Sequence, residues 1–196
     1  MTPSPFIIFA LPRSRTAWLA SWLCHGGEYK VAHDLTMNCR RPADFFSMLA
    51  ECDGTTETGA EIGWRLIRNV LPKSKFLVIR RDIDDVEDSL AAKGITGVRD
   101  QLEEREIMLE AISALPGTET FAFDDLKIKR CCKWIWEHLL EVPFDEPWWK
   151  RCNSLNIQID MEYRKKEFIA KAEVLAQLRL DILAMQKDLG QCLTLN

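Results

Sequence analysis

The chain has 196 residues, of which 47% are hydrophobic, and its 26 basic and 30 acidic residues give a formal net charge of −4. This length supports one substantial α/β core and is short for two full domains. The negative balance argues against a nucleic-acid partner held by bulk electrostatics, so any anion site must be local. No apolar run approaches the roughly 20 residues of a membrane span, and no secretory signal opens the chain, so we expect no membrane partner.

The cysteines and histidines further limit the chemistry that the sequence supports. The 7 cysteines include no CxxC pair, and the 3 histidines form no HxxxH motif. Scattered cysteines of this kind are typical of reduced thiols, so we expect a cytoplasmic protein. Neither residue type has the spacing of a zinc site, and we expect no metal.

The first part of the chain predicts a strand that leads directly into a helix. Residues 6–11 are uniformly apolar, as in a parallel strand covered on both faces. From Arg15 the apolar residues recur at helical spacing until Gly26 and Gly27 end the pattern. Residues 29–33 then predict a weak second strand.

The next part of the chain carries weaker signals. Within residues 34–60 we expect a helix near 44–51, and we interpret the polar stretch 52–59 (CDGTTETG) as a turn-rich loop. A short helix is expected at 64–70. Residues 75–79 then give the clearest interior strand.

Strands and helices continue to alternate up to residue 140. Asp82 is expected to cap a helix that runs to about Lys93, and a charged helix follows over about 98–115. A further strand is predicted at 118–123 and an amphipathic helix at 127–140. This alternation predicts an α/β fold with a mostly parallel central sheet flanked by helices.

The tail, residues 156–196, predicts a helical extension of an α/β domain formed by residues 1–155. Apolar residues recur every seven positions, which produces a narrow seam along one long helix. The seam either docks onto the chain's own domain or pairs with a second copy in a homodimer, and both alternatives stay open. It comprises Phe168, Leu175, Ile182 and Leu189, with Leu178 and Met185 between them.

The junction between the first strand and the first helix is rich in cations and hydroxyls. A tight loop that opens a helix presents free backbone N–H groups at the positive end of the helix dipole, which suits a phosphate or a similar oxyanion. Arg13 and Arg15 add positive charge there, and Ser14 and Thr16 add hydroxyls. The loop is neither a Walker A sequence nor GxGxxG.

A second junction of the same kind follows the strand at residues 75–79. Arg81 follows that strand and stands eight residues before Ser89, about two helical turns. In parallel sheets such junctions gather at the carboxyl ends of the strands. The two junctions therefore predict a site for two phosphate-like groups of one ligand.

These junctions resemble the sulfotransferase family, which uses the sulfate donor 3′-phosphoadenosine 5′-phosphosulfate (PAPS). Residues 12–18 (PRSRTAW) lie over the family's 5′-phosphosulfate loop, and Arg81 with Ser89 lies over its 3′-phosphate element. The resemblance spans roughly residues 5–150 and implies a three-layer fold of the P-loop type. Further similar segments, in the family's order, are 72–75 (PKSK), 121–126 (FAFDDL) and 139–149 (LLEVPFDEPWW).

The resemblance implies a role for each matching residue. Arg13 would bind the 5′-phosphosulfate and neutralise the bridging oxygen as the sulfuryl group departs. Arg81 and Ser89 would clamp the 3′-phosphate, and no metal is implied. The other donor contacts would come from Ser14, Arg15, Thr16 and Ala17 around the phosphosulfate and from Trp18 against adenine.

The acceptor hydroxyl or amine needs a base within hydrogen-bonding reach of its proton. In this family the base is a His or a Glu, in several branches just after the second strand. Here His33 ends the second predicted strand, with Asp34 as its orienting partner or as the base itself. Glu57 and Glu61 are reserve candidates.

The sequence therefore predicts a PAPS-dependent sulfotransferase that acts on a small-molecule or glycan acceptor. One alternative is a kinase-like P-loop phosphoryl transferase, which needs a metal-binding acid such as Asp124 or Asp125. A second alternative is a non-catalytic nucleotide-binding or assembly protein of the same fold.

Overall fold

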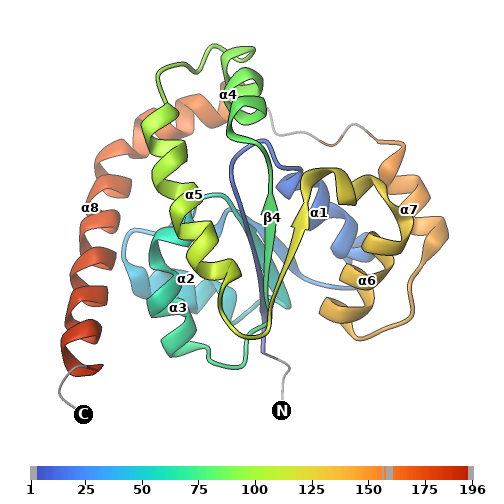
Figure 1. The fold of residues 1–196 in the computed structure, drawn as a ribbon, viewed down its shortest axis with the longest axis horizontal. Helices are drawn as coiled ribbons and strands as arrows, with labels where there is room; N and C mark the ends of the chain where they lie inside the picture. The colour runs from blue at the N-terminus through green and yellow to red at the C-terminus, as the bar shows by residue number, and fades with distance from the viewer. Residues whose placement is uncertain (1–3, 156, 158–160, 194–196) are drawn as a thin grey trace.

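A computed structural model of the protein describes residues 4–155, 157 and 161–193. Its centre is a five-stranded sheet in the order β2-β3-β1-β4-β5, in which every neighbouring pair is parallel. Helices cover both faces, which confirms the predicted three-layer α/β class (Figure 1). The strands are β1 (Phe6–Ala10), β2 (Val31–His33), β3 (Gly54–Glu57), β4 (Phe76–Arg80) and β5 (Thr118–Ala122).

Strand β1 lies at the centre of the sheet, as its uniformly apolar sequence predicts, and all its residues are buried. Its register pairs Phe9 with Glu57 of β3 and Ala10 with Ile79 of β4. On the far side of β3, His33 of β2 pairs with Thr56. Because the strands are parallel, the loops that follow them meet along one side of the sheet, which we call the carboxyl edge.

One face of the sheet is covered by a core rich in tryptophan. The Trp18 and Trp22 rings stack with their centroids 5.1 Å apart, and Trp22 lies 5.4 Å from Trp136. Such aromatic contacts add to the burial of large apolar surfaces. The helices of this face are α1 (Thr16–Leu23), α6 (Lys129–Leu140) and α7 (Glu146–Asn153) (Figure 1).

The second face carries the larger set of helices. Their apolar side chains form one core cluster with the β1 and β4 side chains that point to this face. The 3₁₀ turns η2 (Leu35–Asn38) and η3 (Ala60–Gly63) contribute to the same cluster. The helices are α2 (Pro42–Leu49), α3 (Trp64–Val70), α4 (Ile83–Ala91), α5 (Arg99–Ser113) and α8 (Met161–Leu193).

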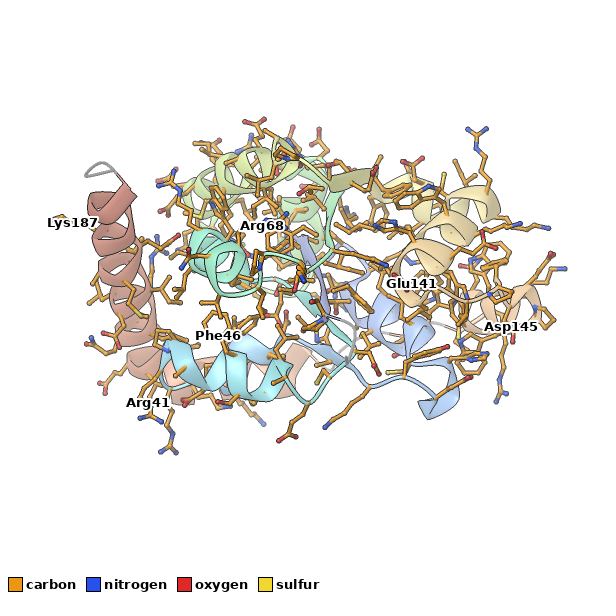
Figure 2. The ribbon with its side chains drawn as sticks, turned by 90° about the horizontal axis from the view of Figure 1, so that it is seen from below. Arg41, Phe46, Arg68, Glu141, Asp145 and Lys187 are labelled. Atoms are coloured by element: carbon orange, nitrogen blue, oxygen red, sulfur yellow. The ribbon has the colours of Figure 1, made fainter. Side chains whose placement is uncertain are left out.

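The long helix α8 docks onto its own domain along part of the predicted seam. Leu178 and Ile182 are buried against the second face, and Met185 is exposed. The helix runs beside α5, away from α6 and α7, and Lys187 lies at the opposite end of the molecule from Asp145 (Figures 1 and 2). The side chains of seam residues Phe168 and Leu189 lie outside the described set. Homodimer formation through α8 stays a prediction.

Strand β3 contradicts the turn-rich loop that we expected at residues 52–59. Thr55, Thr56 and Glu57 are 0% exposed, although all are polar. Their side chains find partners inside the fold: Thr55 Oγ1 donates to Glu57 Oε1 at 2.6 Å, and Thr56 Oγ1 donates to Thr16 O at 3.1 Å. Buried polar groups are tolerated when hydrogen-bonded, so this polar segment occupies an interior strand.

Within the described ranges, no helix has both the length and the apolar character needed to cross a membrane.

Candidate functional site

The loop between β1 and α1, residues 11–15, lies at the carboxyl edge and carries two left-handed arginines. Arg13 has φ 66° and Arg15 has φ 61°. A residue with a side chain pays roughly 1–2 kcal/mol for this conformation, which glycine adopts freely. Strained residues of this kind persist where their surroundings hold them, and they cluster at ligand sites.

The start of α1 is suited to an anion. The first N–H groups of a helix have no partner inside the helix, and the dipole makes that end positive. Beside them, Ser14 is fully buried, and its Oγ has no hydrogen-bond partner among the described residues. An unpaired buried hydroxyl is costly unless a ligand or water completes it. The arrangement thus has the donors for an oxyanion at the place that the sequence indicates.

The two predicted junctions converge at this loop. Arg13 Nε donates to Ser89 Oγ of α4 at 3.1 Å, and Arg81 Nη1 donates to the backbone carbonyl of Arg13. The residues that the resemblance gives to the two ends of one nucleotide therefore lie on the same face of the molecule.

Arg81 lies in a partly buried position beside another cation. Its guanidinium stacks over the Phe123 ring at 4.3 Å. Burial lowers the pKa of Arg81, the Asp85 carboxylate opposes this effect, and the positive charge of Arg13 lowers the pKa further against Asp124. The two arginines repel each other, and the nearby carboxylates offset part of that repulsion.

Some of the acidic side chains that follow Arg81 have partners other than Arg81. Asp82 caps α4 by accepting from Asp84 N at 2.8 Å. Arg99 of α5 binds the Asp84 carboxylate and also Glu87, at 3.3 Å. The negative charge at the start of α4 is therefore partly neutralised by a cation outside the loop.

The Arg15 side chain is engaged with residues of the turn after β5 and of α7. Its guanidinium donates to Leu126 O at 3.3 Å and to Asn153 Oδ1 at 3.0 Å, and it lies 4.0 Å from the Trp18 ring centroid. Burial lowers the pKa of Arg15. These contacts hold the loop against α7 and the turn η4 (Phe123–Lys127), so they explain the left-handed backbone at Arg15 without a ligand.

The structure contradicts the adenine-stacking role that the resemblance implies for Trp18. The side chain is 2% exposed, Arg15 covers its ring and Trp22 stacks on it, and its Nε1 donates to Cys152 O at 3.0 Å. A ring engaged in this way offers no face to adenine, so Trp18 belongs to the core. Ala17, in contrast, stays partly exposed in the first turn of α1.

His33 and Asp34 lie next to the arginine loop. His33 Nε2 is 3.0 Å from Thr16 Oγ1, and His33 Nδ1 is 3.6 Å from Asp34 Oδ2. Asp34 Oδ1 accepts from both N and Oγ1 of Thr58, at 2.7 and 3.0 Å. A carboxylate fixed on one side of an imidazole favours the tautomer whose other nitrogen can accept a proton, and here that nitrogen faces the loop.

Glu57, a reserve candidate for the base, has a different environment. It is fully buried at the end of β3, where Oε1 accepts from Leu35 N at 2.7 Å and Oε2 accepts from Thr36 Oγ1 at 2.8 Å. Burial, followed by the nearby Asp34 carboxyl, raises the pKa of Glu57 to about 8 despite these hydrogen bonds. The burial of Glu57 is not predicted from the sequence, because a glutamate in a polar stretch gives no signal of burial.

The remaining acidic candidates are engaged in local structure. Glu61 is 2% exposed and pairs with Arg105 of α5. Asp124 is exposed and pairs with Lys127 at 2.6 Å, while Asp125 accepts from Ala122 N at 2.9 Å. No group of three or more His, Cys, Asp or Glu side chains suited to a metal occurs among the described residues.

In comparison with known proteins, the chain matches no protein-family model and no curated protein.

Proposed function

We propose that this protein is a PAPS-dependent sulfotransferase that acts on a hydroxyl or amine. The observation that carries the proposal is the convergence of Arg13, Arg81 and Ser89 at the start of α1. These groups supply two cations and a hydroxyl where the helix dipole also favours an anion. The buried, unpaired Ser14 hydroxyl supports the same reading. From the unpaired cysteines of the sequence, we place the reaction in the cytoplasm.

The residues divide the reaction into two tasks. In sulfuryl transfer the acceptor oxygen or nitrogen bonds to sulfur, and the bond from sulfur to the bridging phosphate oxygen breaks. Arg13 stabilises the negative charge that gathers on that bridging oxygen. His33, held by Asp34, takes the proton that the acceptor loses. Thr16, the first residue of α1, lies 3.0 Å from His33.

The binding test uses the desulfated nucleotide 3′-phosphoadenosine 5′-phosphate (PAP) in the absence of magnesium. We expect saturating PAP to raise the unfolding temperature by about 5–10 °C, because a ligand at 100 times its Kd stabilises by about 2.7 kcal/mol. Stabilisation only by Mg-ATP would favour the kinase-like alternative. Indifference to both nucleotides would favour the non-catalytic alternative.

A matched pair of variants makes the test specific to the loop. Arg13→Ala should abolish the PAP-induced shift and the turnover of PAPS, because it removes the cation at the phosphosulfate. Lys73→Ala removes the same charge from an exposed position before β4, at the opposite edge of the sheet, and should leave both unchanged. Equal behaviour of the two variants would contradict the role of Arg13.

A further inference from the structure

A cavity of about 500 Å³ lies on the tryptophan-rich face of the molecule, beyond the end of α1. Much of its wall comes from the turn η1 (His25–Gly27) and from residues 142–147, which connect α6 to α7. Because α1 begins at the arginine loop and spans about 12 Å, the cavity lies away from that loop. Its lining includes His25, Glu28, Tyr29, Trp136, Phe144 and Asp145.

The His25 side chain reaches from η1 to the beginning of α7 and lies between two carboxylates. Its Nδ1 contacts Glu28 Oε2, and its Nε2 lies 3.0 Å from Asp145 Oδ2. A neutral imidazole carries one N–H and can donate to only one of these carboxylates, whereas an imidazolium donates to both. In the neutral form, a nitrogen lone pair would face a carboxylate oxygen. The geometry therefore favours the charged form of His25.

Aromatic rings surround the same imidazole. The ring of His25 is nearly perpendicular to the rings of Trp136 and Trp148, with centroids 5.1 and 5.7 Å away. It is stacked on the Tyr29 ring at 6.3 Å. Aromatic faces carry negative charge density and attract cations. His25 therefore occupies a place, built from two carboxylates and several rings, that suits an organic cation.

The backbone at His25 adds a second constraint, because it is left-handed, with φ 46°. This conformation is strained for a residue with a side chain, so the side-chain contacts help to hold it. Burial lowers the pKa of His25, but the hydrogen bonds with Asp145 and Glu28 outweigh this effect, and the pKa is raised above 6.5. The two carboxylates thus hold both the proton and the strained turn.

The other charged groups around the cavity have partners of their own. Glu146 pairs with Lys129 of α6 at 2.7 Å and with Lys150 at 2.9 Å, and these hydrogen bonds lower the pKa of Glu146 to about 2. The Arg151 guanidinium lies 5.7 Å from the Trp148 ring centroid. These groups therefore keep their charges when His25 gains or loses a proton.

The Tyr29 phenol is the remaining ionisable group that faces His25. Burial, followed by the Glu28 carboxylate, raises the pKa of Tyr29 above 10.0. Histidine is the residue type that ordinarily changes its charge between pH 5 and 8. The charge of His25 therefore responds to pH in a range in which Tyr29 stays neutral.

Helix α7 connects this cavity to the arginine loop. At its start, Asp145 Oδ1 accepts from Trp148 N at 2.9 Å, so the carboxylate that contacts His25 also caps the helix. At its other end, Asn153 Oδ1 accepts from Arg15 at 3.0 Å. The helix is thus held at both ends, and the contact at its start depends on a proton.

We propose that His25 is a proton-controlled latch that fastens the start of α7 to the end of α1. When His25 is protonated, the imidazolium bridges Glu28 and Asp145, and the latch is closed. When the proton leaves to solvent through the cavity, one of the two contacts is lost and the start of α7 loosens. The pH thereby sets how firmly α7 is held behind Arg15. The proposal does not depend on the proposed sulfotransferase function.

The first measurement is a proton NMR titration of the His25 ring, assigned among the 3 histidines of the chain by His25→Gln. We expect its pKa to lie above 6.5. Asp145→Asn should lower this pKa, because it removes the carboxylate at Nε2 and keeps a residue that caps a helix. The matched control is Glu146→Gln, which removes the same charge from a carboxylate paired with lysines and should lower the pKa of His25 less. An ordinary pKa, or equal effects of the two variants, would contradict the bridge.

The second measurement is hydrogen exchange at the backbone amides of α7, expressed as protection factors that remove the intrinsic pH dependence of exchange. The latch contributes stability that is complete below pH 6.5 and is lost as the pH rises through the raised pKa of His25. From about pH 5.5 to about pH 9.5, we expect the protection of α7 to fall about tenfold or more, because a charge-assisted hydrogen bond is lost. The amides of α3, on the other face of the sheet, are the reference and should keep their protection.

The variant His25→Gln decides whether the histidine causes this change. We expect the pH-dependent fall at α7 to be absent in the variant, because glutamine does not titrate. A fall of equal size in the variant would show that another group controls α7. No fall in the unaltered chain would show that His25 binds its proton without acting on the helix. Both measurements are made without a nucleotide, so their failure is separate from any failure of PAP to bind.

Discussion

The two halves of the carboxyl edge differ in charge and in how that charge is satisfied. The cations Arg13 and Arg81 lie after β1 and β4. Arg81 donates a hydrogen bond to the backbone carbonyl of Arg13, and the unpaired Ser14 hydroxyl is the next residue along the loop. After β2 and β3 lie the acids Asp34 and Glu57, which accept hydrogen bonds from threonines and backbone N–H groups within the fold. We call these the cationic half and the acidic half.

The difference indicates which half requires a ligand. The acidic half is largely complete in itself, so its groups can be held in fixed positions. The cationic half concentrates positive charge and leaves a buried hydroxyl unsatisfied, and an anionic ligand would stabilise it. On the proposed function, the cationic half binds the donor and His33 beside it accepts the proton.

His33→Ala, at the boundary between the halves, should have the largest effect. We expect the rate of sulfuryl transfer from PAPS to an accepting alcohol or amine to fall about 10²- to 10⁴-fold, because the positioned base is lost. The affinity for PAP, measured by calorimetry, should stay unchanged, since the donor contacts belong to the cationic half. A matching loss of PAP affinity would show that the halves are not separable.

Glu57→Leu tests whether the acidic half is structural. The change leaves buried donors of Leu35, Thr36 and Thr55 without an acceptor. We therefore expect the free energy of unfolding to fall by about 3 kcal/mol or more. Urea denaturation measures this loss. A loss below about 1 kcal/mol, the range of ordinary surface changes, would contradict the role of Glu57 as the centre of this network.

The control for this prediction is Glu57→Gln, which keeps the shape of the side chain and removes its ionisable carboxyl group. Because the pKa of Glu57 is raised from 4.5 to about 8, the folded state binds its proton more tightly than the unfolded state does. Glu57 therefore contributes less stability as the pH rises from about 4.5 to about 8. Relative to Glu57→Gln, the unaltered chain should lose stability across this range, and an unchanged difference would contradict the raised pKa.

Arg81→Ala and Ser89→Ala sharpen the description of the cationic half. A charge-assisted contact with phosphate contributes about 1.5–3 kcal/mol, so we expect Arg81→Ala to weaken PAP binding about 10- to 100-fold. Ser89→Ala removes one neutral hydroxyl and should weaken it about 3- to 10-fold. Calorimetric Kd values decide this order, and a larger effect at Ser89 than at Arg81 would reverse the assignment.

Arg15 should give the smallest effect, since its side chain serves the fold. Arg15→Ala and Arg15→Gly both lose the contacts with Asn153 and Leu126, and only glycine adopts the left-handed backbone without strain. We expect the glycine variant to be the more stable by about 1 kcal/mol in thermal or urea unfolding. PAP affinity should be similar in both, and a large loss would return Arg15 to the ligand site.

The sequence by itself determined those features that depend on local pattern. The apolar runs of β1 and β4 identify interior strands, the helical spacing after Arg15 and after Asp82 identifies α1 and α4, and the cationic residues stand out at the strand ends. These signals lie within a few residues of each other along the chain, because side-chain periodicity and capping are local. They were enough for the fold class, and the proposed anion site rests on them.

Only the tertiary structure decided which side chains serve the site. It turned Arg15 toward Asn153, buried Trp18 under it, and made a central strand of the polar segment that ends at Glu57. It also laid part of α8 against its own domain and formed the cavity beside His25. The parallel register brings residues that are far apart in the chain into contact, and whether a polar side chain is buried depends on partners that the local sequence does not name.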